Sequence, residues 1–209
     1  TVYSKSLKDS SFCWIKVTYA NMSNSREFLQ FVGHGDNDYI TFNQIYTYNK
    51  KRKKLNCINS FNTNASYQNE IVAADKNYVT IHNSDQPAEV GWISWNIPYK
   101  YSKGKLVAAT TSTTTVKSLI ANNKKDKYSK YFAKNQFVTA KKLTFYNGSK
   151  VAYTVPKGKV VTLTKLSLSK DVIYLQFKYG KKTGWAHVNG TKYNFSKPWF
   201  QGVNARLAG

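Results

Sequence analysis

Residues 172–189 read VIYLQFKYGKKTGWAHVN, and the fold that we predict rests on the pattern of this stretch. Apolar Leu175 and Phe177 alternate with polar neighbours, which is the period of a β-strand with one apolar and one polar face. A turn rich in Gly and Lys follows, and Gly184-Trp185 opens a return strand. The stretch therefore predicts a complete β-hairpin.

The same sequence pattern occurs at residues 78–96, YVTIHNSDQPAEVGWISWN, where a second Gly-Trp pair, Gly91-Trp92, falls at the corresponding position. A weaker copy without such a pair covers residues 14–32, WIKVTYANMSNSREFLQFV. Three hairpins of one kind in a chain of 209 residues favour several small modules over one large domain.

The clearest strand pattern follows residue 137. Strands are predicted at residues 143–146, 151–155 and 160–166, and an Asn-Gly turn and a Pro-Lys-Gly turn separate them. Short strands closed by tight turns predict a small β-barrel. We therefore expect an all-β protein.

Changes in composition predict the domain organisation. We expect one or more N-terminal β modules over residues 1–109, with residues 1–35 as a candidate half module, and a C-terminal module over residues 137–209. A linker over residues 110–136 begins with the low-complexity run TTSTTT and holds at most one or two helical turns. Because the chain starts partway through a module, we expect it to be a piece of a longer protein.

The formal net charge of +22 is the largest compositional feature, since 32 Lys and Arg residues face 10 acidic residues. Only Arg26, Arg52 and Arg206 are arginines. Lysine is a hydrated point charge, whereas arginine makes the bidentate contacts that read bases and fixed phosphates. The balance predicts diffuse attraction to a repeating anionic polymer.

A run of five basic residues, KKRKK, has two interpretations. It is either a solvated hairpin tip or loop, or a patch that contacts anions. Its members are Lys50, Lys51, Arg52, Lys53 and Lys54.

Aromatic side chains beside lysines are the other candidates for binding, because a flat ring stacks on a sugar or contacts an ammonium group. Trp92 and Trp185 are predicted to be core residues of the modules. The remaining ligand-binding candidates outside the basic run are Trp95, Tyr99, Tyr101, Lys181, Lys182, Tyr193 and Trp199.

Two cysteines, Cys13 and Cys57, are too few for a disulfide scaffold, and both a single bridge and two buried thiols fit the sequence. No apolar run approaches 18 residues, so we expect no membrane insertion.

A hydrolase needs a nucleophile with its base, a metal site or paired carboxylates, and the three histidines have no such pattern. The segment from His34 to Asp38 fits a turn better than a cation site. We expect no catalysis, metal or cofactor.

The order of a short strand, a Pro-Lys-Gly-Lys turn, a Tyr-led strand and Gly-Trp followed by Val-Asn resembles bacterial SH3-like modules. More specifically, it resembles the Gly-Trp and related cell-wall modules of Gram-positive surface proteins, including lactobacillal S-layer proteins. The likeness covers residues 137–200, and more loosely residues 39–105. It implies tandem SH3-like barrels in a secreted protein that is held non-covalently on the cell wall, often through teichoic or lipoteichoic acid.

These observations leave three interpretations open. The first is a non-enzymatic attachment module that binds teichoic acid, lipoteichoic acid or peptidoglycan at the cell surface. The alternative is a basic β-barrel protein that binds nucleic acid, because aromatic rings also stack on bases. The third is a structural subunit whose parent protein self-assembles into a surface lattice.

Overall fold

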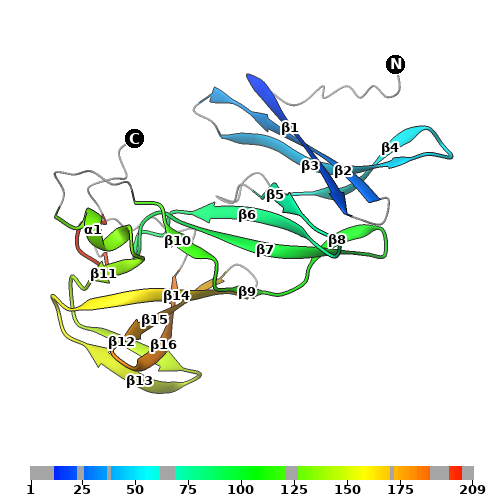
Figure 1. Ribbon diagram of the computed structural model, residues 1–209. Coiled ribbons are helices and arrows are strands. Elements are labelled where there is room, and N and C mark those ends of the chain that lie inside the picture. The colour runs from blue at the N-terminus through cyan, green and yellow to red at the C-terminus, as the bar shows by residue number, and fades with distance from the viewer. Residues whose placement is uncertain are drawn as a thin grey trace. The chain divides into compact units, whose positions relative to one another are not determined.

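The computed structural model describes residues 12–22, 26–36, 39–61, 69–120, 127–169, 172–188 and 198–203 (Figure 1). These residues form antiparallel sheets and one short helix, α1 (Ser129–Phe132), which confirms the all-β prediction. No helix in the described part of the chain is long and apolar enough to cross a membrane.

The strands group into two compact units. The first draws on residues 1–83 and 97–110, and the second on residues 84–96 and 111–209. Where we expected a linker, the described residues contribute two short strands and α1 to the second unit.

The first unit contains a four-stranded antiparallel sheet with the order β1-β2-β3-β4. Its first hairpin is formed by the weak copy of the repeated sequence pattern. Trp14 pairs with His34 at one end, and Met22 pairs with Arg26 at the other. The strands are β1 (Trp14–Met22), β2 (Arg26–His34), β3 (Ile40–Asn49) and β4 (Lys54–Ser60).

A second antiparallel sheet has the order β10-β7-β6-β5, with β8 paired to β7. The predicted hairpin at residues 78–96 is its centre. The strands are β5 (Glu70–Ala74), β6 (Val79–Asp85), β7 (Ile93–Ser102), β8 (Lys105–Ala108) and β10 (Val116–Ser118).

Apolar side chains of both sheets form the core of the first unit. Met22, Phe28 and Ile45 from the first sheet are buried in one cluster with Ile81 and Leu106 from the second. The first unit is therefore two antiparallel layers packed face to face, which is how each sheet buries its apolar side.

The second unit is organised around a seven-stranded antiparallel sheet with the order β11-β14-β15-β16-β12-β13 and with β9 paired to β14. The predicted strands are all present, and the predicted hairpin is formed over residues 172–188. The strands are β9 (Ser112–Thr113), β11 (Gln136–Val138), β12 (Leu143–Asn147), β13 (Lys150–Val155), β14 (Val160–Ser169), β15 (Val172–Tyr179) and β16 (Lys182–Val188).

The strands of this sheet are strongly curved in Figure 1, and buried aromatic side chains pack together in its core. Phe177 on β15 lies 5.8 Å from Phe137 on β11 and 5.4 Å from Phe145 on β12, measured between ring centroids, and it also contacts Phe200. All four rings are fully buried. No sheet formed by the described residues closes on itself.

The two Gly-Trp pairs need glycine for different physical reasons. Gly91 has φ 71°, a left-handed conformation that glycine adopts without strain. Gly184 lies in β16, where an added Cβ would come within 2.9 Å of Cβ of Phe145. One sequence signal therefore marks a tight turn in one hairpin and a close packing contact in the other.

Candidate functional site

The candidate site lies on the face of β14, β15 and β16 opposite the aromatic core. Ile173, Leu175 and Phe177 of β15 point into the core, so Tyr174 and Gln176 point outward. Directly paired residues of antiparallel strands share a face. Two rows of side chains therefore cross the outer face from strand to strand.

The first row runs from Ser167 through Tyr174 to His187, and the rings of Tyr174 and His187 lie 6.0 Å apart. The second row runs from Gln176 through Trp185 to Tyr146 on β12. Because Trp185 and His187 are two residues apart on β16, both rows lie on the same face.

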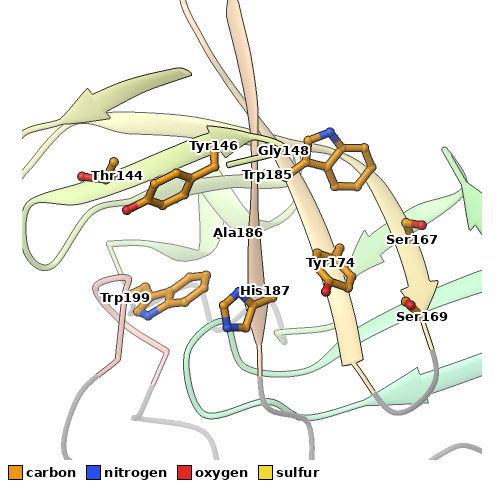
Figure 2. A pocket seen from close by; sticks show the side chains of 10 residues that line it. All are labelled: Thr144, Tyr146, Gly148, Ser167, Ser169, Tyr174, Trp185, Ala186, His187 and Trp199. Carbon is orange, nitrogen blue, oxygen red and sulfur yellow. The ribbon is translucent and has the colours of Figure 1, made fainter. Parts of the chain in front are cut away.

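Apart from Gln176, the residues of these rows line an open pocket of about 730 Å³, which Trp199 completes (Figure 2). The view shows the rings of Tyr146 and Trp185 along one side and those of Trp199, His187 and Tyr174 along the other. Hydroxyl groups complete the polar lining, and they come from Thr144, Ser167 and Ser169. Flat rings beside hydroxyl groups can stack on sugar rings and hydrogen-bond their substituents.

Two lysines of the described strands lie beside this pocket. Lys165 pairs with Gln176 and therefore continues the Trp185 row, and Lys178 lies two residues beyond Gln176 on the same face of β15. Among the described residues that line the pocket there is no Lys or Arg. The face thus offers aromatic stacking at its centre and ammonium groups at its border.

Lys181 and Lys182 line a second open cavity, of about 580 Å³, at the β15–β16 turn. Tyr153 and Tyr179 also line it, and their rings lie 6.3 Å apart. Burial raises the pKa of Tyr153 to about 12, and its hydroxyl donates a hydrogen bond to the Phe177 carbonyl oxygen at 2.6 Å.

The basic run lies in the first unit, at and just after the β3–β4 turn. All five side chains, from Lys50 to Lys54, are exposed. The turn is held by the Arg52 amide, which donates to Oδ1 of Asn49 at 2.9 Å. The run is thus a solvated hairpin tip, and its exposed charges remain open to anions.

Tyr99 and Tyr101, on β7, are only partly exposed and pack against the core of the first unit. Burial raises the pKa of Tyr99. Tyr101 differs in that one side of its ring lies under the guanidinium group of Arg26, at 4.8 Å from centroid to Cζ. Tyr101 is therefore a contact point for a cation as well as part of the core.

The predicted roles of two tryptophans are reversed. Trp95, expected as a ligand candidate, is 1% exposed, whereas Trp92, expected in the core, is 44% exposed. The reason is that β7 begins at Ile93, so the inward series runs through Ile93, Trp95 and Ile97. Trp92 precedes the strand.

Two further aromatic predictions have different outcomes. Trp185, expected in the core, is partly exposed and lines the pocket, as does the predicted candidate Trp199. Tyr193 lies outside the described residues.

The cysteines and the His34 segment make no metal site among the described residues. Cys13 and Cys57 are free and exposed, so neither the bridge nor the buried thiols that the sequence allowed are found. The Cys13 thiol donates to Oδ1 of Asp36 at 3.1 Å, and this hydrogen bond raises the pKa of Cys13. His34 is buried and stacks on Trp14 with 3.7 Å between ring centroids, while Asp38 lies outside the described residues.

Sequence reasoning missed most of the pocket. Tyr146, Tyr174 and His187 were not among the candidates, although the alternation of β15 had already placed Tyr174 on the polar face. The same alternation applied to β16 puts Trp185 and His187 together on one face. The missing information was the pairing of β12 with β16, which joins Tyr146 to Trp185.

Comparisons of the chain with models of protein families, with curated proteins and with solved structures found no match.

Proposed function

We propose that this protein is a non-catalytic attachment module that binds an anionic polymer of the Gram-positive cell wall, such as teichoic or lipoteichoic acid. In this role it anchors a secreted surface or S-layer protein. The observation that carries the proposal is the outer face of β14–β16, where Lys165 and Lys178 lie beside the aromatic rings of the pocket.

The chemistry of this face suits a polymer that alternates sugar or polyol units with phosphate. Rings such as Trp185 and Tyr174 offer flat apolar surfaces to the uncharged units. Lys165 and Lys178 attract the phosphates without needing a fixed geometry. Each contact is modest, and the affinity arises from many contacts along one polymer chain.

The charge of the whole chain supports the same proposal. Because 32 Lys and Arg residues face 10 acidic residues, most of the positive charge is uncompensated even where ion pairs form, as between Lys16 and Glu70. The resemblance to SH3-like wall modules adds the expectation that the curled sheet of the second unit is one such module.

Nucleic acid remains the second candidate, because the rows of aromatic rings can also stack on bases. The scarcity of Arg argues against it, since base edges are read mainly by bidentate side chains. A single-stranded oligonucleotide that outcompetes teichoic acid at matched phosphate concentration would favour this alternative.

Replacing one ring of the pocket tests the proposal. We expect Trp185→Ala to weaken the binding of purified Gram-positive walls by about tenfold, as removal of a central aromatic contact does at other interfaces. Trp92→Ala is the matched control, because Trp92 is an exposed tryptophan of the same unit that does not line the pocket. Binding is measured by co-sedimentation, and circular dichroism checks that both variants fold. Equal binding by the two variants would count against the pocket.

A further inference from the structure

A second cationic feature lies at one edge of the first unit, around Tyr101. Arg26 begins β2, and its guanidinium group stacks on the Tyr101 ring at 4.8 Å. The Phe28 ring also packs against Tyr101, with 5.8 Å between the ring centroids. These contacts hold the Tyr101 ring in place and position a planar cation at the surface.

Two small cavities flank this stacked pair, and both are lined by Arg26 and Tyr101. The cavity of about 200 Å³ adds Lys50, from the β3–β4 turn. The cavity of about 120 Å³ adds Lys76, from the β5–β6 turn, and Lys100, from β7. Each volume is several times the roughly 30 Å³ of one water molecule, which leaves room for a phosphate group.

The four cations come from different elements that the fold brings to one edge. The beginning of β2, the end of β7 and two hairpin turns supply one cation each. Because they are distant in sequence, no basic run marks them, and Lys50 alone belongs to KKRKK.

The acidic groups nearby offset only part of this positive charge. Glu27 lines the larger cavity and accepts a hydrogen bond from the Tyr19 hydroxyl at 3.3 Å. Asp75 accepts hydrogen bonds from the Asn77 and Tyr78 amides at 2.7 and 2.8 Å. Within the described residues, none of the four cations makes an ion pair. Among the described residues, the edge therefore carries four positive charges against one lining carboxylate.

We propose that Arg26, Lys50, Lys76 and Lys100, arranged around Tyr101, form a phosphate-binding site that takes the phosphodiester groups of an anionic polymer. A guanidinium group fixed on a ring can donate two parallel hydrogen bonds to phosphate oxygens, and the lysines add charge from both sides. The identity of the polymer as a wall glycan rests on the function proposed above, whereas binding of the phosphate group does not.

The test uses the full chain and sn-glycerol 3-phosphate as the probe, followed by NMR chemical shifts. We expect shifts concentrated at the five residues of the site. Arg26→Gln should raise the dissociation constant by about tenfold, because it removes a charge-assisted contact. Arg52→Gln is the matched control: it removes the same charge from an exposed arginine that lines neither cavity, and it should weaken binding less than about twofold. Equal weakening by the two variants, or shifts spread over all lysines, would overturn the site.

Tyr101 supplies a second check. Tyr101→Phe retains the ring under the guanidinium and should bind the probe as the parent protein does, while Arg26→Lys retains charge but loses the planar fork and should bind more weakly. Poly(glycerol phosphate) and a single-stranded oligonucleotide then identify the source of the phosphate. Preference for the oligonucleotide at matched phosphate concentration would overturn the assignment to a glycan polymer. If glycerol phosphate binds but walls do not, the proposed function fails and the phosphate site stands.

Discussion

Tyr153 joins the two sides of the curled sheet in the second unit. Its hydroxyl donates to the carbonyl oxygen of Phe177, and its ring stacks on Phe145 with 5.0 Å between centroids. Ionisation would place a charge in this apolar environment and break the hydrogen bond. Because burial disfavours the charged form, it raises the pKa of Tyr153 to about 12.

The raised pKa predicts a dependence of stability on pH. Unfolded tyrosine loses its proton near pH 10, whereas the folded protein holds this proton until about pH 12. The stabilising contribution is therefore complete below about pH 10 and is lost between about pH 10 and pH 12. Tyr153→Phe should lower the free energy of unfolding by about 1 kcal/mol at neutral pH and flatten its decline above about pH 10. Urea unfolding of both proteins from neutral pH to about pH 12 measures this difference. Identical dependence of the free energy of unfolding on pH would contradict the assignment of the raised pKa to Tyr153.

At the scale of single residues, the sequence predicted which side chains point outward only where the strand boundary was clear. Between residues 172 and 179 the alternation is unbroken, and the burial of Ile173, Leu175 and Phe177 follows it. Around Trp92 and Trp95 it failed, because the positive φ of Gly91 belongs to a turn that shifts the start of β7 to Ile93. Burial there depends on where the turn ends.

At the scale of elements, a buried polar network links β2 and β3 to the chain that enters β5. Gln30 is fully buried, and its Nε2 donates to Oδ1 of Asn43 at 2.8 Å and to the carbonyl oxygen of Asn69 at 2.6 Å. Its Oε1 accepts from the Ile71 amide at 2.7 Å. One side chain thus connects the two sheets of the first unit.

Gln30→Leu should therefore destabilise the protein by about 3 kcal/mol, since it removes three buried hydrogen bonds, including the one that the Ile71 amide donates to Gln30. Asn21→Leu is the control, because Asn21 is exposed on the neighbouring strand β1, and its effect should stay within about 0.5 kcal/mol. Chemical unfolding of both variants measures the difference. A loss for Gln30→Leu no larger than that of the control would show that the network contributes little.

Hairpins were predictable from the sequence because their two strands are close in sequence. All three copies of the repeated sequence pattern form paired strands. The exposed tip at residues 50–54 was predictable for the same reason. The pocket was not, because it needs the curl that brings β12 beside β16 and the approach of Trp199 from beyond the sheet. The cations around Tyr101 likewise meet only when four separate elements reach one edge.

At the scale of the whole molecule, the central claim is that a chain of net charge +22 binds a repeating anionic polymer with two different surfaces. In this proposal, the pocket of the second unit binds uncharged units of the polymer through aromatic rings, and the edge of the first unit binds its phosphates. Since a polymer can engage both surfaces in many registers, the total affinity should exceed that of either surface alone.

Co-sedimentation of the protein with purified Gram-positive walls, before and after extraction of teichoic acid and across a series of salt concentrations, tests this claim most directly. We expect binding to intact walls, loss of binding after extraction, and weakening as salt rises from about 0.05 M to 1 M, because screening shortens the reach of the lysines to about 3 Å. Binding that survives both extraction and high salt would contradict the account and point to a neutral glycan ligand. Failure to bind intact walls at low salt would contradict it outright.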